Sequence, residues 1–163
     1  MSPGRQSIQT VVGIFLAVAL AAGPSSSASF AVEPGKRIGP VAIGMTEHEV
    51  LNAVGGRMRP AQGPAREVLE IPAHGLTVWL STERVIRIRT TNAAHKTQSG
   101  YGPGDENWTR ARQALCNGGV SEASAVHMTA AGFEVRCPFA GLVLEVSRDR
   151  IVGLVVLPSE RLR

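Results

Sequence analysis

The chain has 163 residues, of which 44% are hydrophobic and 18% are charged. Its 17 basic and 13 acidic residues leave a net charge of +4, and the basic residues are spread along the chain. Because nucleic-acid binding requires a concentrated basic face, this pattern argues against a nucleic-acid partner. The length suits one compact unit or two small interlocked lobes.

Residues 1–31 have the pattern of a secretory signal peptide. Arg5 precedes an apolar run from Val11 to Ala22, which small residues follow. That run is about a dozen residues long, whereas a membrane-spanning helix needs about 20. Cleavage after Ala28 or after Ala31 satisfies the small-residue rule, and we favour Ala31. With no cysteine directly after the run to carry a lipid, we expect a secreted, extracellular or cell-envelope protein without an integral membrane segment once the signal is removed.

Residues 32–91 are predicted to form a first lobe. Its opening stretch Val32–Pro40, rich in proline and glycine, is expected to be an arm or an initial edge strand. A short helix should follow, because Thr46 can serve as its N-cap and Glu49, three residues later, completes a capping box. The pair Gly55-Gly56 is expected to end the helix. A helix this short needs a partner surface for its apolar stripe.

A twenty-residue stretch recurs sixty-six positions later in the chain. Leu69–Ile88 aligns without a gap with Val135–Leu154, and five of the twenty positions are identical, against roughly one expected by chance. Each copy is predicted to be strand, Pro-x-x-Gly turn, strand, tight polar turn and strand, because apolar and polar residues alternate between turn residues. We interpret this as an internal repeat. A loop with a brief edge strand is expected before the first copy.

The alternation also predicts which strand residues face the core. In the first copy these are Leu69, Ile71, Leu76, Val78, Leu80, Ile86 and Ile88. In the second copy they are Phe133, Val135, Leu142, Leu144, Val146, Val152, Leu154 and Val156. The residues between them should lie on an opposite, mostly polar face.

The rest of the chain is predicted to contain a linker and a second lobe. Residues 92–104 have the polar, Gly- and Pro-rich composition of a linker, 105–157 form the second lobe, and 158–163 form a tail. We expect a helix over Glu106–Cys116 with Asp105 as its cap. The segment Val120–Gly132 fits either an extra strand or a short helix.

Cys116 and Cys137 are the only cysteines of the chain, and both fall in the second copy. A chain addressed to an oxidising compartment is expected to bond them. The bridge would tie the second helix to the first strand of its own copy. A reactive thiol is the competing interpretation, but it needs a nearby base and an intracellular setting.

The predicted fold class is α+β, with two tandem repeats that each pack a short helix on a three-stranded, or four-stranded, antiparallel sheet. The segment Ile43–Gly55, IGMTEHEVLNAVG, and the three strands behind it resemble the tandem-repeat folds of SmpA/OmlA-type small envelope lipoproteins and of secreted beta-lactamase inhibitor proteins. The resemblance implies a short capped helix on an antiparallel meander, and a role at the envelope or as an inhibitor. The chain departs from these families in lacking the lipid-bearing cysteine and a second Gly-Met-Thr opening.

No catalytic or metal-binding constellation is apparent in the sequence. Its four histidines share neither a helix face nor a close spacing, and nucleophile-elbow and phosphate-loop motifs are missing. Glu83 and Asp149 could mimic a carboxylate pair, but each is better explained as a turn residue of its own copy. We therefore expect a protein that is not an enzyme and that carries no cofactor and no metal.

The strongest functional candidate is the polar face of the predicted sheet. Trp79 lies there with Arg87 and Arg89 of the neighbouring strand, and Glu145 is expected on the matching face of the second copy. Because Trp and Arg are enriched at binding hot spots, we expect this face to bind another protein. Alternatively, Trp79 is covered by the N-terminal arm or the linker, or merely stacks on an arginine.

A second hypothesis places function elsewhere. An envelope structural or ligand-binding module would use the crevice between the lobes, near Tyr101 and Trp108.

Overall fold

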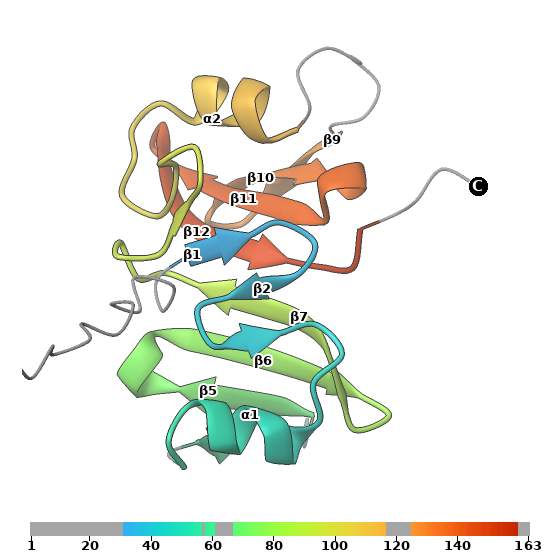
Figure 1. Ribbon diagram of the computed structural model, residues 1–163. Helices are drawn as coiled ribbons and strands as arrows, with labels where there is room; N and C mark the ends of the chain where they lie inside the picture. The colour runs from blue at the N-terminus through green and yellow to red at the C-terminus, as the bar shows by residue number, and fades with distance from the viewer. Residues whose placement is uncertain (1–30, 57, 61–66, 117–124, 160–163) are drawn as a thin grey trace, which may run out of the picture.

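A computed structural model describes residues 31–56, 58–60, 67–116 and 125–159 (Figure 1). The predicted signal peptide, apart from Ala31, and most of the predicted tail lie outside these residues. Within the described ranges the chain is α+β and mostly β, as predicted, with antiparallel pairing dominant. No helix in the described part of the chain is long and apolar enough to cross a membrane.

One large sheet of eight strands forms the back of the molecule (Figure 1), in the order β4-β5-β6-β7-β12-β11-β10-β9. Every neighbouring pair in it is antiparallel. Its strands are β4 (Arg59–Pro60), β5 (Val68–Ile71), β6 (Leu76–Ser81), β7 (Arg84–Thr90), β9 (Ala125–Thr129), β10 (Gly132–Cys137), β11 (Leu142–Ser147) and β12 (Arg150–Val156). The two halves join where β7 pairs with β12, so they form one continuous surface.

The two predicted copies have the same local plan. In each, a strand is followed by a 3-10 turn that begins at a proline, namely η2 (Pro72–His74) and η3 (Pro138–Ala140). Gly75 and Gly141 then take left-handed φ values of 62° and 63°. A two-residue turn with positive φ follows at residues 82–83 and again at 148–149. This confirms the turn role of Glu83 and Asp149, whereas the tandem duplication itself stays a prediction.

The structure corrects two of the predicted core positions. The register of the large sheet shifts between Trp79 and Leu80 opposite β7, and again at the equivalent place opposite β12. Each shift leaves one extra residue in the longer strand, a β-bulge that reverses the alternation beyond it. Ile86 and Val152 occupy these bulges and are 44% and 39% exposed, so the prediction that they face the core is wrong. Val85 and Ile151 are buried in their place.

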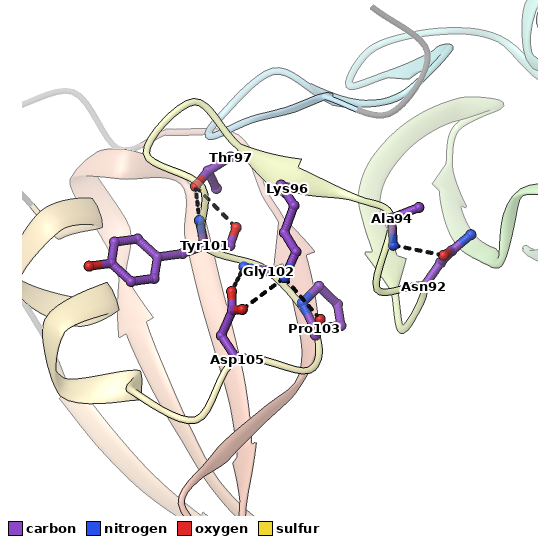
Figure 2. A network of polar contacts seen from close by, with 8 residues as sticks. All are labelled: Asn92, Ala94, Lys96, Thr97, Tyr101, Gly102, Pro103 and Asp105. Atoms are coloured by element: carbon purple, nitrogen blue, oxygen red, sulfur yellow. Dashed lines mark hydrogen bonds and ion pairs between the residues drawn. The ribbon is translucent and has the colours of Figure 1, made fainter. Parts of the chain in front are cut away.

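A second, small sheet that the sequence did not predict covers the large one. Its order is β3-β2-β1-β8, from β1 (Ala31–Glu33), β2 (Arg37–Ile38), β3 (Val41–Ala42) and β8 (Lys96–Thr97). The expected arm therefore folds back on itself, and the expected linker adds a strand parallel to β1. Figure 2 shows the polar contacts that hold this linker, in which Lys96 Nζ lies 2.9 Å from Asp105 Oδ1 and donates to the Pro103 carbonyl.

The helix α1 (Glu47–Ala53) has the capping box that the sequence predicts. The Glu49 N–H donates to Thr46 Oγ1 at 3.3 Å, and the Thr46 N–H donates to Glu49 Oε2 at 2.7 Å. These bonds satisfy two backbone donors that the first turn leaves free. The charged Glu49 carboxylate accepts from the Thr46 N–H and from the Thr46 hydroxyl, and these two bonds lower its pKa.

The helix α2 (Trp108–Leu115) begins later than predicted. Its cap is Asn107, whose side chain accepts from the Arg110 N–H, and not Asp105. Asp105 is engaged by the Gly102 N–H and the Lys96 ammonium, so it is not available as a cap (Figure 2). Beyond the helix, residues 125–129 form β9, so the strand alternative is correct for this part of Val120–Gly132. Residues 120–124 lie outside the described ranges.

The predicted disulfide between Cys116 and Cys137 is present. It joins the C-cap of α2 to the last residue of β10, as predicted from the sequence. Buried apolar residues from both helices, both sheets and this bridge form one cluster, which lies on a single face of the large sheet.

Candidate functional site

The large sheet has one face that the described helices and small sheet leave uncovered. Both helices and the small sheet lie on the other side (Figure 1), where their buried residues enter the core. We call the uncovered side the open face. Strand alternation and register place these residues on it: Arg59, Val68, Glu70, Thr77, Trp79, Arg87, Arg89, Glu134, Arg136, Val143, Glu145, Gly153 and Val155.

Trp79 and Arg87 form one unit at the first half of the open face. They are opposite each other on β6 and β7, and the Arg87 guanidinium carbon lies 4.5 Å from the Trp79 ring centroid. Such a cation–π contact contributes about 1 kcal/mol. Both side chains are half-buried, and Arg87 Nε is shielded without a hydrogen-bond acceptor among the described residues. The stacking of Trp79 on an arginine, which was the alternative to a binding role, is therefore present in the structure.

Arg89 and Glu145 form the second unit, and they meet across an intervening strand. Arg89 Nε donates to both carboxylate oxygens of Glu145 at 2.8 and 2.9 Å, although the residues belong to β7 and β11. Their side chains are 34% and 17% exposed. The hydrogen bonds that the charged guanidinium donates to Glu145 raise the pKa of Arg89. The two charges of this pair therefore neutralise each other.

Gly153 of β12 makes the crossing contact between Arg89 and Glu145 possible. It is the register partner of Glu145, and a Cβ at this position would collide with the Glu145 carboxylate. A glycine inside a strand often marks such a close approach. The sequence therefore held a signal for this contact, which sequence reasoning missed.

Two further ion pairs lie on the open face. Arg59 Nη2 lies 2.9 Å from Glu70 Oε2 on the neighbouring strand, and Arg136 Nη2 lies 3.1 Å from Glu134 Oε2. Arg59, Arg89 and Arg136 thus each contact a carboxylate, and Arg87 contacts an aromatic ring instead. Near the middle, Val143 and Val155 are buried outside the main core cluster.

All four residues predicted to bind a partner lie on the open face, but in two separate pairs. Trp79 contacts Arg87, and Arg89 contacts Glu145. Their role in binding stays a prediction, and the structure gives the two pairs different chemistry. The first leaves a cation without a carboxylate, whereas the second is neutralised internally.

The residues of the crevice hypothesis pack inward. Tyr101 and Trp108 are partly buried against the core, and the Trp108 ring meets Phe133 edge-to-face with centroids 5.0 Å apart. A nearby hollow of about 330 Å³ is lined by Pro34, Thr97, Gln98, Ser99, Ala114, Leu115, Phe139, Ala140 and Ser159. Neither aromatic residue of the hypothesis belongs to this lining.

His95 is buried, unlike His48, His74 and His127. Its Nδ1 lies 2.6 Å from Thr90 Oγ1, which also contacts the Gly75 carbonyl at 3.2 Å. Burial lowers the pKa of His95, and the charge of His74 lowers it further. Across the described residues, no three His, Cys, Asp or Glu side chains are grouped so that they could hold a metal ion.

Comparisons of this chain with protein-family models, with curated proteins and with solved structures find no match.

Proposed function

We propose that the chain is an exported, non-catalytic module that binds another protein, as an inhibitor or an envelope scaffold, through the open face around Trp79 and Arg87. The observation that carries this proposal is the contrast among the arginines of that face. Arg59, Arg89 and Arg136 each contact a carboxylate, whereas Arg87 lies on the Trp79 ring. The partner should supply the carboxylate that Arg87 lacks.

The chemistry of the stacked pair suits this role. A guanidinium is planar and weakly hydrated, so it can keep an aromatic contact on one side and bind a carboxylate through its edge. Charge-assisted bonds of this kind are about twice as strong as neutral ones. Because β6 and β7 pair directly at Trp79 and Arg87, the two side chains are held in place before a partner arrives.

Export is proposed from the N-terminal pattern, with support from the disulfide. Bonded cysteines are typical of oxidising compartments. Ala31, after which we favoured cleavage, is the first residue of β1, and its carbonyl accepts from the Gly39 N–H at 2.9 Å. Cleavage after Ala28 would keep this bond, whereas cleavage after Ala31 would remove it. Residue-level mass spectrometry of the exported N-terminus distinguishes the two.

The resemblance to SmpA/OmlA-type lipoproteins and beta-lactamase inhibitor proteins remains a proposal based on the segment Ile43–Gly55. The capped helix with its Gly-Met-Thr opening and the antiparallel meander are compatible with it. An envelope or inhibitory role is proposed on that ground alone.

The test is quantitative affinity capture from the secreted fraction of the host. The double variant Trp79→Ala/Arg87→Ala should capture at least about tenfold less of the partner than the wild type does, since hot-spot residues carry much of the binding energy. The matched control is Glu134→Ala/Arg136→Ala, which removes an internally paired unit from the same face and should retain capture. Circular dichroism establishes that both variants are folded. Equal capture by wild type and the Trp79/Arg87 variant would overturn the proposal.

A further inference from the structure

The large sheet ends in two edges with different properties. At one end, β4 is two residues long and contains Arg59 and Pro60, and proline lacks the N–H that a pairing strand needs. At the other end, β9 is five residues long and, among the described residues, pairs only with β10. Short edge strands, charges and prolines are the usual means by which proteins block edge pairing. Of these two edges, as far as the described residues define them, β9 is therefore the one whose extended backbone is open to another strand.

The side chains of β9 favour pairing as well. Its sequence AVHMT contains no Asp, Glu, Lys, Arg or Pro. Val126 is 50% exposed and Met128 is 81% exposed. They are the register partners of Val135 and Phe133, and the Phe133 ring contacts Trp108 of α2. An apolar shelf made of Val126, Met128 and Phe133 thus continues up to the free edge on the helix side of the sheet.

We propose that β9 pairs antiparallel with β9 of a second copy of this chain, about a two-fold axis through His127. Antiparallel pairing about that axis places Val126 of one copy opposite Met128 of the other, on the same side as the shelf. His127 would lie opposite itself, and Ala125 opposite Thr129. An isologous interface of this kind joins one patch to itself.

The chemistry of β9 selects a second copy over a charged partner. β9 has no Asp, Glu, Lys or Arg that could pair with the charges of a charged strand. Specificity for a different partner usually relies on electrostatic complementarity of that kind. Self-pairing brings no Asp, Glu, Lys or Arg opposite a like charge within the five residues. It also covers the apolar shelf of one copy with that of the other. The shared strand would join the two large sheets, and each would keep its open face.

The interface that β9 alone supplies is small. Stable interfaces bury roughly 1,200 Å² or more, and one short strand pair with its shelf falls at or below that range. The dimer should accordingly be weak, with a Kd in the micromolar range of about 1 to 100 μM.

Sedimentation velocity on the full exported chain, from about 1 μM to about 300 μM, measures this equilibrium. We expect a monomer–dimer equilibrium for the wild type, and a monomer throughout for Val126→Lys/Met128→Lys, since lysine on an edge blocks pairing. Ile86→Lys is the control, because Ile86 is an exposed apolar residue on a strand inside the sheet. It should dimerise like the wild type. A wild type that stays monomeric, or a dimer that survives both lysines, overturns the proposal.

A second measurement tests the register. Residues directly opposite in an antiparallel pair have Cα atoms about 4.5–5.5 Å apart, within the range that a disulfide spans. His127→Cys should therefore form a covalent dimer under mild oxidation, whereas Val152→Cys, an exposed control, should not. Equal crosslinking of the two variants, or none from His127→Cys, would contradict pairing about His127.

Discussion

The segments β5–β7 and β10–β12 have the same backbone plan and different surfaces. Both have a left-handed glycine, a positive-φ turn and a bulge at equivalent places. At the same register position, however, the first has Trp79 opposite Arg87 and the second has Glu145 opposite Gly153. Turns and bulges constrain the backbone, whereas the open face tolerates different residues. The proposed function therefore follows the side chains of one half and not the shared plan.

The largest difference between the segments should come from alanine at the two equivalent glycines. At Gly141 a Cβ would collide with the Leu157 carbonyl and lie 2.6 Å from Gly35 Cα, both backbone atoms. At Gly75 it meets only the Asn92 side chain, at 3.0 Å. Gly141→Ala should cost about 4 kcal/mol of unfolding free energy, and Gly75→Ala about 1–2 kcal/mol from left-handed strain.

Urea denaturation of the two glycine variants, side by side, checks this difference. The account would be contradicted by equal losses, because then the surroundings of the two turns would not matter. Gly55→Ala, where a Cβ meets nothing within 4 Å, is the control for the left-handed strain alone.

The second difference is the disulfide, which only the β10–β12 segment has. Replacing both Cys116 and Cys137 with alanine should lower the free energy of unfolding by about 3 kcal/mol, because the bridge restricts the conformational freedom of the unfolded chain. Thermal unfolding of the wild type with and without reductant measures the contribution of the disulfide independently. A variant as stable as the wild type under oxidising conditions would show that packing alone holds α2 to β10.

A smaller change concerns the unit formed by Arg89 and Glu145. Gly153→Ala should displace the Glu145 carboxylate and cost about 1 kcal/mol, a typical value for a charge-assisted hydrogen bond that is partly exposed. In the double-mutant cycle with Glu145→Gln, the effect of alanine at position 153 should shrink. An undiminished effect would mean that the added methyl group disturbs the backbone instead.

The smallest effect is a pH dependence at His95, which lies just beyond β7 and contacts the last residue of that strand, Thr90. Burial lowers the pKa of His95 below its ordinary 6.5. The unfolded chain therefore binds the proton more readily than the folded chain does. The contribution of His95 to the free energy of unfolding is fully present above about pH 6.5, and it is lost as the pH falls toward the lowered pKa of the folded state. Between about pH 8 and about pH 5.5, the wild type should lose more stability than His95→Gln. Identical losses would exclude His95 as the cause.

Local signals in the sequence predicted much of this fold. The capping box at Thr46 and Glu49, the turn residues and the cysteine pair each depend on neighbours in sequence or on a single pairing. The small sheet was not predicted, because strands of two or three residues are too short to show a periodicity, and because the pairing of β1 with β8 joins residues far apart in the sequence. The bulges at Ile86 and Val152 were missed for a related reason. An unbroken alternation gives no sign that one residue is extra.

The residues of the candidate site were predicted from the sequence, whereas the ion pair between Arg89 and Glu145 was not. Alternation alone placed Trp79, Arg87, Arg89 and Glu145 on one face. That Arg89 reaches Glu145 depends on β7 lying next to β12, a contact between segments that no local pattern encodes.

The most direct test of the central claim is site-specific photo-crosslinking to the captured partner. A benzophenone amino acid at Thr77, beside Trp79 on β6, would report on the first half of the open face, and one at Glu134 on β10 would report on the second half. The account predicts a crosslinked partner from position 77 and none from position 134. Crosslinking from position 134 alone, or from neither position, would contradict it.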